Sequence, residues 1–292
     1  MNKVDIPRKI TFKGKNSGPA LLIFGAIHGD EVSGPNAIEK IIDKFKNKHL
    51  YLKKGSVTFV PICNPQAYDL NKRYVEENLN RVFTKTTNPK TYEARLANIL
   101  CTYADTADIL LDIHSTFADG PVNVFVDYPT EKNKSLAEAL CAEYTIFDWP
   151  KAYKNNPYKL KSYTTDKYMH NIGKSGIVLE CGQHNDLASI LVAEKSIIRI
   201  LSYLEMIPMV KDTNITSRSK QVKMNKIYVK NGENDCFTKN WRHLELIPDG
   251  TVIATRENGD KILAEKNSVI LFPKTYAKIR EEWFYLGESM AI

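Results

Sequence analysis

The sequence contains no long hydrophobic run. Its apolar stretch at residues 20–27 carries no charge but is short, whereas a membrane-spanning helix needs roughly 18 or more apolar residues. The opening residues, MNKVDIPRKI, lack the apolar segment of a secretory signal. We therefore expect a cytoplasmic protein with no membrane partner.

Cysteine is scarce, and its spacing excludes a disulfide framework. The five cysteines, at positions 63, 101, 141, 181 and 236, form no C-x-x-C pair, a pattern typical of reduced thiols. The net charge of +7 is spread along 292 residues without a basic stripe of interleaved aromatic residues, so we expect no nucleic-acid partner. The content of 43% hydrophobic and 26% charged residues is that of an ordinary globular protein.

The most informative stretch is G-A-I-H-G-D-E at residues 25–31. The apolar run before it predicts a buried strand at 21–27, and apolar residues at helical spacing after it predict a helix at 35–46. His28 and Glu31 are thus expected at the carboxyl end of a strand, the edge at which open α/β sheets bind ligands. With a later histidine they can form the His₂Glu zinc site of metallohydrolases. A surface turn is the alternative for H-x-x-E alone.

Alternating strand and helix patterns predict an α/β domain over residues 1–210. Further strands are expected at residues 56–62, 108–113, 122–126 and 176–182, and further helices at 92–104, 134–144 and 187–206. Residues 64–88 form a long loop rich in potential ligands, and such loops are usually functional. Short alternating runs separated by D-G and N-G turns predict a second, all-β domain at 218–292.

Two further strand ends carry reactive side chains. His114 follows the run ILLDI and is either a structural histidine or a third metal ligand beside His28 and Glu31. Asp112 points to the same sheet face and is either an acceptor for that histidine or a half-buried carboxylate. Glu180 lies in the apolar run GIVLECG, where an unpaired carboxylate is costly, so it is either ion-paired or a general base beside a metal.

The long loop contributes Arg73, Asn80 and Arg81. An asparagine next to an arginine offers amide donors and a planar guanidinium, which together suit a carboxylate ligand. The loop therefore predicts a carboxylate-binding site, with an ordinary solvated surface as the alternative.

Four ordered motifs resemble those of the succinylglutamate desuccinylase/aspartoacylase family, a branch of the zinc carboxypeptidase clan. They are G-x-x-H-G-x-E, N-P-x-A-Y-x-x-x-K-R-Y-x-E-x-x-L-N-R-x-F, D-x-H-S-T and G-I-x-L-E-x-G, and E-E-W-F-Y-L-G at 281–287 is similar to the family's ending. The resemblance implies a mixed central sheet flanked by helices. It also implies a small C-terminal all-β domain that narrows the active-site entrance.

The resemblance implies roles for the reactive residues at the strand ends. His28, Glu31 and His114 would bind one zinc ion per chain. Glu180 would activate the attacking water, and Arg73 would polarise the scissile amide and stabilise the oxyanion.

The resemblance also implies a set of substrate contacts. Asn80 and Arg81 would hold the substrate carboxylate, and Tyr276 or Tyr285 would line the pocket. The predicted activity is hydrolysis of the N-acyl amide bond of a small N-acyl amino acid. The alternatives are a zinc carboxypeptidase acting on peptides and, in another class, a non-catalytic metal- or ligand-binding scaffold. Homo-oligomer formation is left open.

One feature of the family is missing. Aspartoacylases carry an arginine shortly before the catalytic glutamate strand that binds a second substrate carboxylate, but no arginine occurs in residues 96–198. Lys161 or Lys167 could supply a positive charge in place of this arginine, but a lysine lacks the bidentate fork of a guanidinium. We therefore expect a preference for substrates whose side chain is not acidic.

Overall fold

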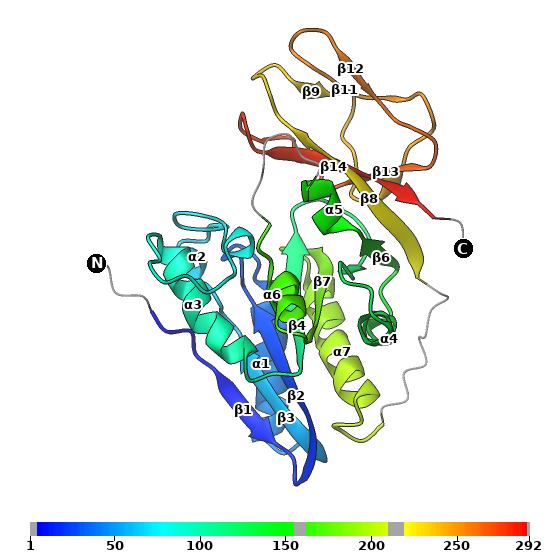
Figure 1. Cartoon of the computed structure of the whole chain (residues 1–292). Helices are drawn as coiled ribbons and strands as arrows, with labels where there is room; N and C mark the ends of the chain where they lie inside the picture. Colours follow the sequence, from blue (N-terminus) through cyan, green and yellow to red (C-terminus); the bar gives the residue numbers. More distant parts are fainter. Residues whose placement is uncertain (1–4, 155–161, 210–218, 291–292) are drawn as a thin grey trace.

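A computed structural model describes residues 5–154, 162–209 and 219–290 (Figure 1). Its centre is an 11-stranded sheet in the order β1-β3-β2-β4-β7-β5-β6-β8-β14-β13-β10. The strands before residue 210 are β1 (Ile10–Lys13), β2 (Asn16–Gly25), β3 (Lys54–Val60), β4 (Ile109–Thr116), β5 (Asn123–Phe125), β6 (Tyr144–Phe147) and β7 (Ser175–Gln183). In the described part of the chain, none of the helices has the length and apolarity of a membrane span.

The centre of the sheet is parallel, and this aligns the strand ends that carry the reactive residues. β2 pairs in parallel with β3 and β4, and β4 pairs in parallel with β7. The carboxyl ends of β2, β4 and β7 therefore meet at one edge of the sheet. The strands expected at 21–27, 56–62, 108–113 and 176–182 are the four that form this centre.

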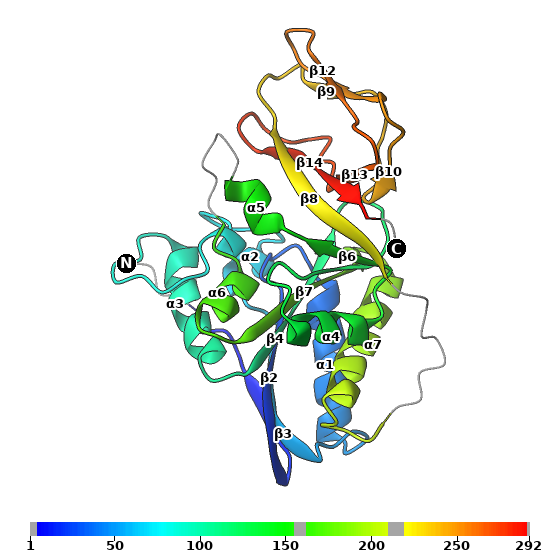
Figure 2. The ribbon, with the colours of Figure 1, turned by 45° about the vertical axis from the view of Figure 1, so that its right-hand side comes forward.

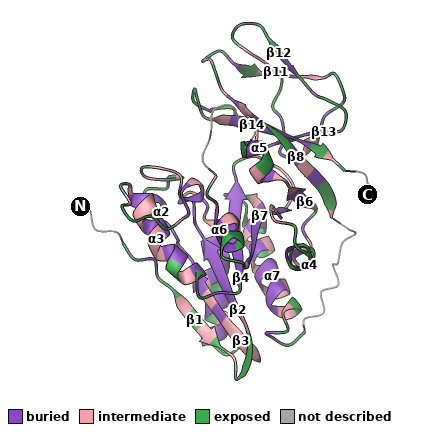
Figure 3. Cartoon of the chain, in the orientation of Figure 1, coloured by how far each residue is buried: buried purple, intermediate pink, exposed green. Residues whose placement is uncertain are grey.

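Helices cover both faces of the sheet, as the alternating pattern predicts (Figures 1 and 3). On one face lie α1 (Ser33–Lys46), α4 (Glu131–Leu140) and α7 (Leu187–Tyr203), packed on strand residues such as Ile23 and Leu111. On the other face lie α3 (Tyr92–Ala104) and α6 (Thr165–Asn171), packed on residues such as Leu22 and Leu110. Neighbouring strand residues thus face opposite cores, which is why these strands read as continuous apolar runs.

The C-terminal strands continue the central sheet. They are β8 (Lys220–Val229), β10 (Glu245–Leu246), β13 (Ser268–Leu271) and β14 (Glu282–Ser289). β8 pairs in parallel with β6 and carries the sheet across to β14 (Figure 2). A separate three-stranded sheet contains β9 (Cys236–Phe237), β11 (Val252–Thr255) and β12 (Lys261–Leu263). The boundary expected between 210 and 218 lies outside the described residues, so the two-domain division stays a prediction.

The helix expected at 134–144 ends earlier than predicted, and the connection after it contains further helices and a strand. The helix α4 stops at Leu140 because Cys141 adopts a left-handed backbone with φ of 55°. The residues that follow form β6, whose partners are β5, which precedes α4, and β8, from the C-terminal part of the chain. α5 (Trp149–Lys154) and α6 then pack where an irregular connection was expected. These segments are too short for periodicity to identify.

Candidate metal and catalytic site

A tight turn after β2 positions His28 and Glu31, and the long loop packs directly against it. A Cβ on Gly29 would lie 2.1 Å from the backbone carbon of Ala67 in α2 (Pro65–Asp69), so only glycine fits there. The Gly29 amide donates to the backbone oxygen of Arg73 at 3.3 Å. The turn and the loop therefore hold each other in place.

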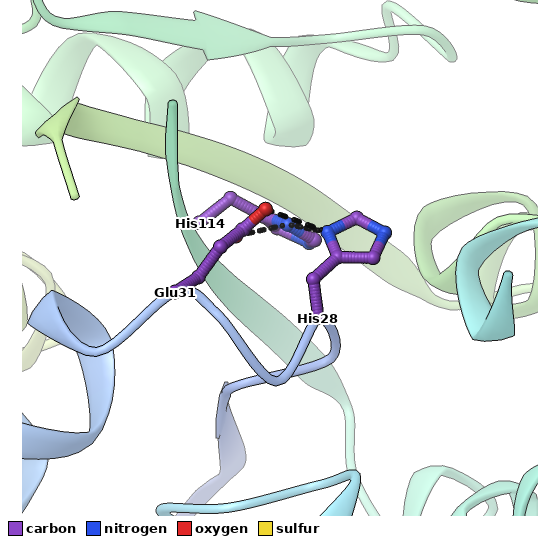
Figure 4. A group of neighbouring side chains, drawn as sticks. All are labelled: His28, Glu31 and His114. Carbon is purple, nitrogen blue, oxygen red and sulfur yellow. Dashed lines mark hydrogen bonds and ion pairs between the residues drawn. The ribbon is translucent and has the colours of Figure 1, made fainter. Parts of the chain in front are cut away.

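The three predicted metal ligands converge (Figure 4). His28 Nδ1 lies 2.7 Å from Glu31 Oε1, and His114 Nδ1 lies 2.9 Å from Glu31 Oε2. The two Nδ1 atoms are 3.2 Å apart. All three residues are buried. The structure thus brings together from β4 and the β2 turn the donor set proposed from the sequence.

The outer nitrogen of each imidazole is held by an acceptor. His114 Nε2 donates to Asp112 Oδ2 at 2.9 Å, and that oxygen also accepts from Thr165 Oγ1 at 2.6 Å. His28 Nε2 donates to Asn78 Oδ1 at 3.0 Å. Of the two readings of Asp112, the acceptor for His114 is the one observed. Asn78 was not identified from the sequence. The only feature that could have pointed to it is its position within the long-loop motif.

The electrostatics of the donor set favour an ionised Glu31 beside a neutral His28. Burial lowers the pKa of His28 to about 3, which keeps this imidazole neutral. Burial also opposes protonation of His114, but the carboxylates of Asp112 and Glu31 outweigh it and raise the His114 pKa. Burial likewise opposes ionisation of Glu31, yet the two histidines hold its pKa well below the usual range. Two inward-facing imidazoles and a carboxylate fit the His₂Glu chemistry of a zinc site.

A second group of potential donors contains Asp30, Glu31 and His184. It shares Glu31 with the first group. The Glu31 oxygens also accept from Arg73 Nη1 at 3.0 Å and from the Ser115 amide at 3.1 Å. The two groups therefore depend on the same carboxylate.

Glu180 lies beside the donor set. In the parallel pairing of β4 and β7, Glu180 is the register partner of His114, so both side chains occupy the same sheet edge. Its Oε2 atom is buried without a hydrogen-bond partner in the protein. Burial raises the pKa of Glu180 to about 8, with Glu31 and Asp112 adding to the effect and His114 and Arg73 opposing it. A pKa near neutrality suits proton transfer, and the general-base role expected from the sequence stays a prediction.

A buried glutamate that the sequence analysis missed organises the long loop. The Glu93 carboxylate accepts from the backbone amides of Val75, Glu76 and Glu77 at 2.6, 3.1 and 3.1 Å. It is fully buried at the start of α3. The loop that delivers Arg73 is therefore fixed by backbone hydrogen bonds to one carboxylate. The signal in the sequence was the position of Glu93 on the apolar face of the helix predicted at 92–104.

The predicted substrate contacts Asn80 and Arg81 are engaged within the protein. Asn80 Oδ1 accepts from the Thr165 amide at 3.2 Å. Arg81 donates from Nε and Nη2 to the carboxylate of Glu282 at 3.3 to 3.4 Å. Both lie in or beside the short 3₁₀ helix η1 (Leu79–Arg81). Their role in substrate binding stays a prediction.

The other predicted contacts lie apart from one another. Tyr285 is buried, and its hydroxyl donates to Glu282 Oε2 at 2.7 Å, whereas Tyr276 is 94% exposed. Lys167 Nζ donates to the backbone oxygen of Ser162 at 2.8 Å and lies over the Tyr163 ring. Lys161 lies outside the described residues.

Comparison with known proteins places this site in a family. Residues 17–204 match the Succinylglutamate desuccinylase/Aspartoacylase catalytic domain. A probable aspartoacylase from a Nostoc species is 27% identical over 174 residues, 55% of this chain and 54% of that protein. A succinylglutamate desuccinylase from Pseudomonas paraeruginosa is 23% identical over 133 residues, 43% of this chain and 40% of that protein. The matched segments thus span about half the length of these relatives.

A solved structure shows the same fold over nearly the whole chain. The succinylglutamate desuccinylase/aspartoacylase from Rhodobacter sphaeroides superimposes with a TM-score of 0.76 at 17% identity, covering 97% of this chain and 89% of that one. The family match includes the turn after β2, the long loop and the ends of β4 and β7, all of which contribute to the site described above. The chain belongs to the succinylglutamate desuccinylase/aspartoacylase family.

Proposed function

We propose that the protein is a zinc-dependent deacylase that hydrolyses the amide bond of a small N-acyl amino acid. The observation that supports this most directly is the convergence of His28, Glu31 and His114 with Glu180 beside them. Membership of a family of desuccinylases and aspartoacylases supports hydrolysis of the same kind of bond.

His28, Glu31 and His114 would hold the zinc ion. When bound, this ion would supply Lewis-acid chemistry that acidifies water and polarises a carbonyl. Asp112 and Asn78 orient the two imidazoles, because each accepts from the nitrogen that faces away from Glu31.

Glu180 and Arg73 supply the chain's own part of the reaction. Glu180 takes a proton from the attacking water while the water oxygen bonds to the acyl carbon. Arg73 lies beside Glu31 with its side chain 35% exposed, so its guanidinium can donate to the oxyanion that develops. Glu180 then delivers the proton to the amide nitrogen as the carbon–nitrogen bond breaks, which releases a carboxylate and an amino acid.

The proposed substrate is an N-acyl amino acid whose side chain is neutral. No arginine is available in residues 96–198 to bind a second carboxylate. Lys167 is one of the two lysines that could replace the missing arginine, and its ammonium donates to the backbone oxygen of Ser162. A buried carboxylate without a charged partner costs several kcal/mol, by an order-of-magnitude estimate.

The test is metal analysis followed by a substrate panel. Purified protein should contain about one zinc per chain and should release the acyl acid from N-acetyl amino acids. Hydrolysis of C-terminal residues from peptides, but not of N-acetyl amino acids, would instead identify a carboxypeptidase. Zinc-loaded protein that hydrolyses neither class would identify a binding scaffold.

A further inference from the structure

One buried threonine, Thr165 at the start of α6, contacts two different parts of the site. Its hydroxyl donates to Asp112 Oδ2 at 2.6 Å, and its backbone amide donates to Asn80 Oδ1 at 3.2 Å. Thr165 and Asp112 are both 0% exposed, and Asn80 is buried as well. The threonine therefore joins the acceptor of a metal-ligand candidate to a predicted contact of the substrate carboxylate.

The direction of both hydrogen bonds follows from the chemistry of the partners. A carboxylate oxygen can only accept, so the Thr165 hydroxyl is the donor to Asp112. A backbone amide can only donate, so the Asn80 atom that it meets is the carboxamide oxygen. This leaves the NH₂ group of Asn80 to serve the substrate carboxylate that we expect there.

The orientation of Asp112 depends on Thr165. Asp112 Oδ2 accepts from His114 Nε2 at 2.9 Å and from the threonine hydroxyl. Asp112 Oδ1 is buried without a hydrogen-bond partner in the described part of the chain. Among those residues, the hydroxyl is thus the one donor besides His114 itself that fixes this carboxylate. A carboxylate that orients a metal-binding imidazole must itself be held in place.

The backbone around Thr165 is closely packed and capped. A Cβ on Gly176 of β7 would lie 2.9 Å from Asp166 Cα, so the first turn of α6 packs directly on the β7 backbone. The Thr164 hydroxyl caps the helix by accepting from the Lys167 amide at 3.4 Å. Thr165 therefore offers its two donors from a fixed position.

The second histidine is connected to the same asparagine by a shorter path. Asn78 Oδ1 accepts from His28 Nε2 at 3.0 Å and from the backbone amide of Asn80 at 2.9 Å. Both imidazoles are thus linked to Asn80, His28 through Asn78 and His114 through Asp112 and Thr165. These hydrogen bonds set the position of the metal donors relative to the predicted substrate contact.

We propose that Thr165 is a positioning residue for the zinc ligand His114, acting through Asp112. The inference rests on the proposed function, because it takes His114 as a ligand of zinc. The hydroxyl holds the Asp112 carboxylate, and the carboxylate holds the imidazole. The amide of the same residue holds Asn80, so the zinc ligand and the predicted carboxylate contact share one fixed point at the start of α6.

The test removes the hydroxyl and measures zinc affinity. Thr165→Val keeps the shape and the backbone amide of the residue. The full chain is stripped of metal, and its dissociation constant for zinc is measured by competition with a chelator. This constant should rise about tenfold or more, the lower range for losing a group that orients a metal-bound histidine. Thr165→Ser retains a hydroxyl donor and should stay within about threefold of the wild type.

The matched control is Thr145→Val, at a buried threonine of β6 whose hydroxyl contacts Ser219. It should bind zinc as the wild type does. A second comparison uses Asp112→Ala, which removes the carboxylate through which Thr165 acts. In that background, Thr165→Val should change zinc affinity by less than about twofold, because the two substitutions break the same interaction.

Three results would overturn the inference while the proposed function stands. In the first, Thr165→Val lowers the melting temperature of the metal-free chain but binds zinc with wild-type affinity, which identifies a purely structural threonine. In the second, Thr165→Ser binds zinc as weakly as Thr165→Val. In the third, the full loss reappears in the Asp112→Ala background. If the wild type itself binds no zinc, the proposed function and this inference both fail.

Discussion

His114 and Glu180 are register partners on the neighbouring parallel strands β4 and β7. The pairing fixes a metal-ligand candidate and a carboxylate of raised pKa side by side, although 66 residues separate them, as 180 minus 114. The backbones of both strands are held on each side by neighbouring strands, which fixes the points from which the two side chains leave the sheet. This rigidity suits a base that must reach the same point as the metal ligands.

Replacing the proposed base should separate catalysis from metal binding. Glu180→Gln is expected to lower kcat by at least about a hundredfold, the lower range for removing a general base. Zinc content and melting temperature should stay close to those of the wild type, because the amide has nearly the same shape. Glu138→Gln, at an exposed helix position, is the control. Near-normal turnover in Glu180→Gln would remove this residue from the mechanism.

The metal ligands can be tested independently of activity. His114→Ala should lose most of the bound zinc, since it removes one of three protein ligands. Asp112→Asn should weaken zinc affinity by about 10- to 100-fold, because it alters the acceptor that orients His114. Elemental analysis after dialysis measures both. His49→Ala, at an exposed histidine, is the control, and full zinc occupancy in His114→Ala would refute the assignment.

Arg73 should act on the transition state more than on substrate binding. Arg73→Ala is expected to lower kcat by about a hundredfold to a thousandfold, the range for removing an oxyanion donor. Arg73→Lys should recover part of the loss, because charge is retained without the planar fork. Steady-state kinetics on the best substrate of the panel decide the matter. A change confined to KM would assign Arg73 to binding alone.

The Arg81–Glu282 pair predicts a pH-dependent contribution to stability. Burial opposes ionisation of Glu282, but Arg81 and Lys274 lower its pKa below the usual value. A carboxylate with a depressed folded-state pKa stabilises the fold above its unfolded pKa of about 4.3, and this contribution is lost as the pH falls further. Glu282→Gln should therefore unfold at lower urea than the wild type near pH 7. The difference between the two midpoints should shrink below about pH 4.

A constant difference in midpoint across that range would show that Glu282 stabilises the fold by packing and not by charge. Glu288→Gln, whose carboxyl lies far along β14, is a suitable control for the loss of one negative charge.

The absence of arginine from residues 96–198 predicts that the preferred amino acid has a neutral side chain. N-acetylaspartate should be hydrolysed with a kcat/KM at least about tenfold below that of the best N-acetyl amino acid with a neutral side chain, a difference of about 1.4 kcal/mol in transition-state binding. A tenfold preference for the acidic substrate would mean that a second cation, such as Lys161 or Lys167, reaches the pocket.

The sequence by itself determined the parts of the protein that depend on local order. The apolar runs at 21–27, 108–113 and 176–182 predict the central strands, because strands buried on both faces are apolar throughout. Parallel strands end at a common edge, so the sequence alone predicts that His28, His114 and Glu180 meet there.

Only the tertiary structure decided which distant groups became partners. The Arg81–Glu282 ion pair joins residues 201 positions apart, and the Lys274 ammonium lies 3.9 Å from the same carboxylate. β6 becomes a strand because β5 and β8 pair with it, and the β6–β8 pairing continues the sheet into the C-terminal part. Such contacts depend on strand order and packing across the chain, and these leave no periodic signal in the residues that make them.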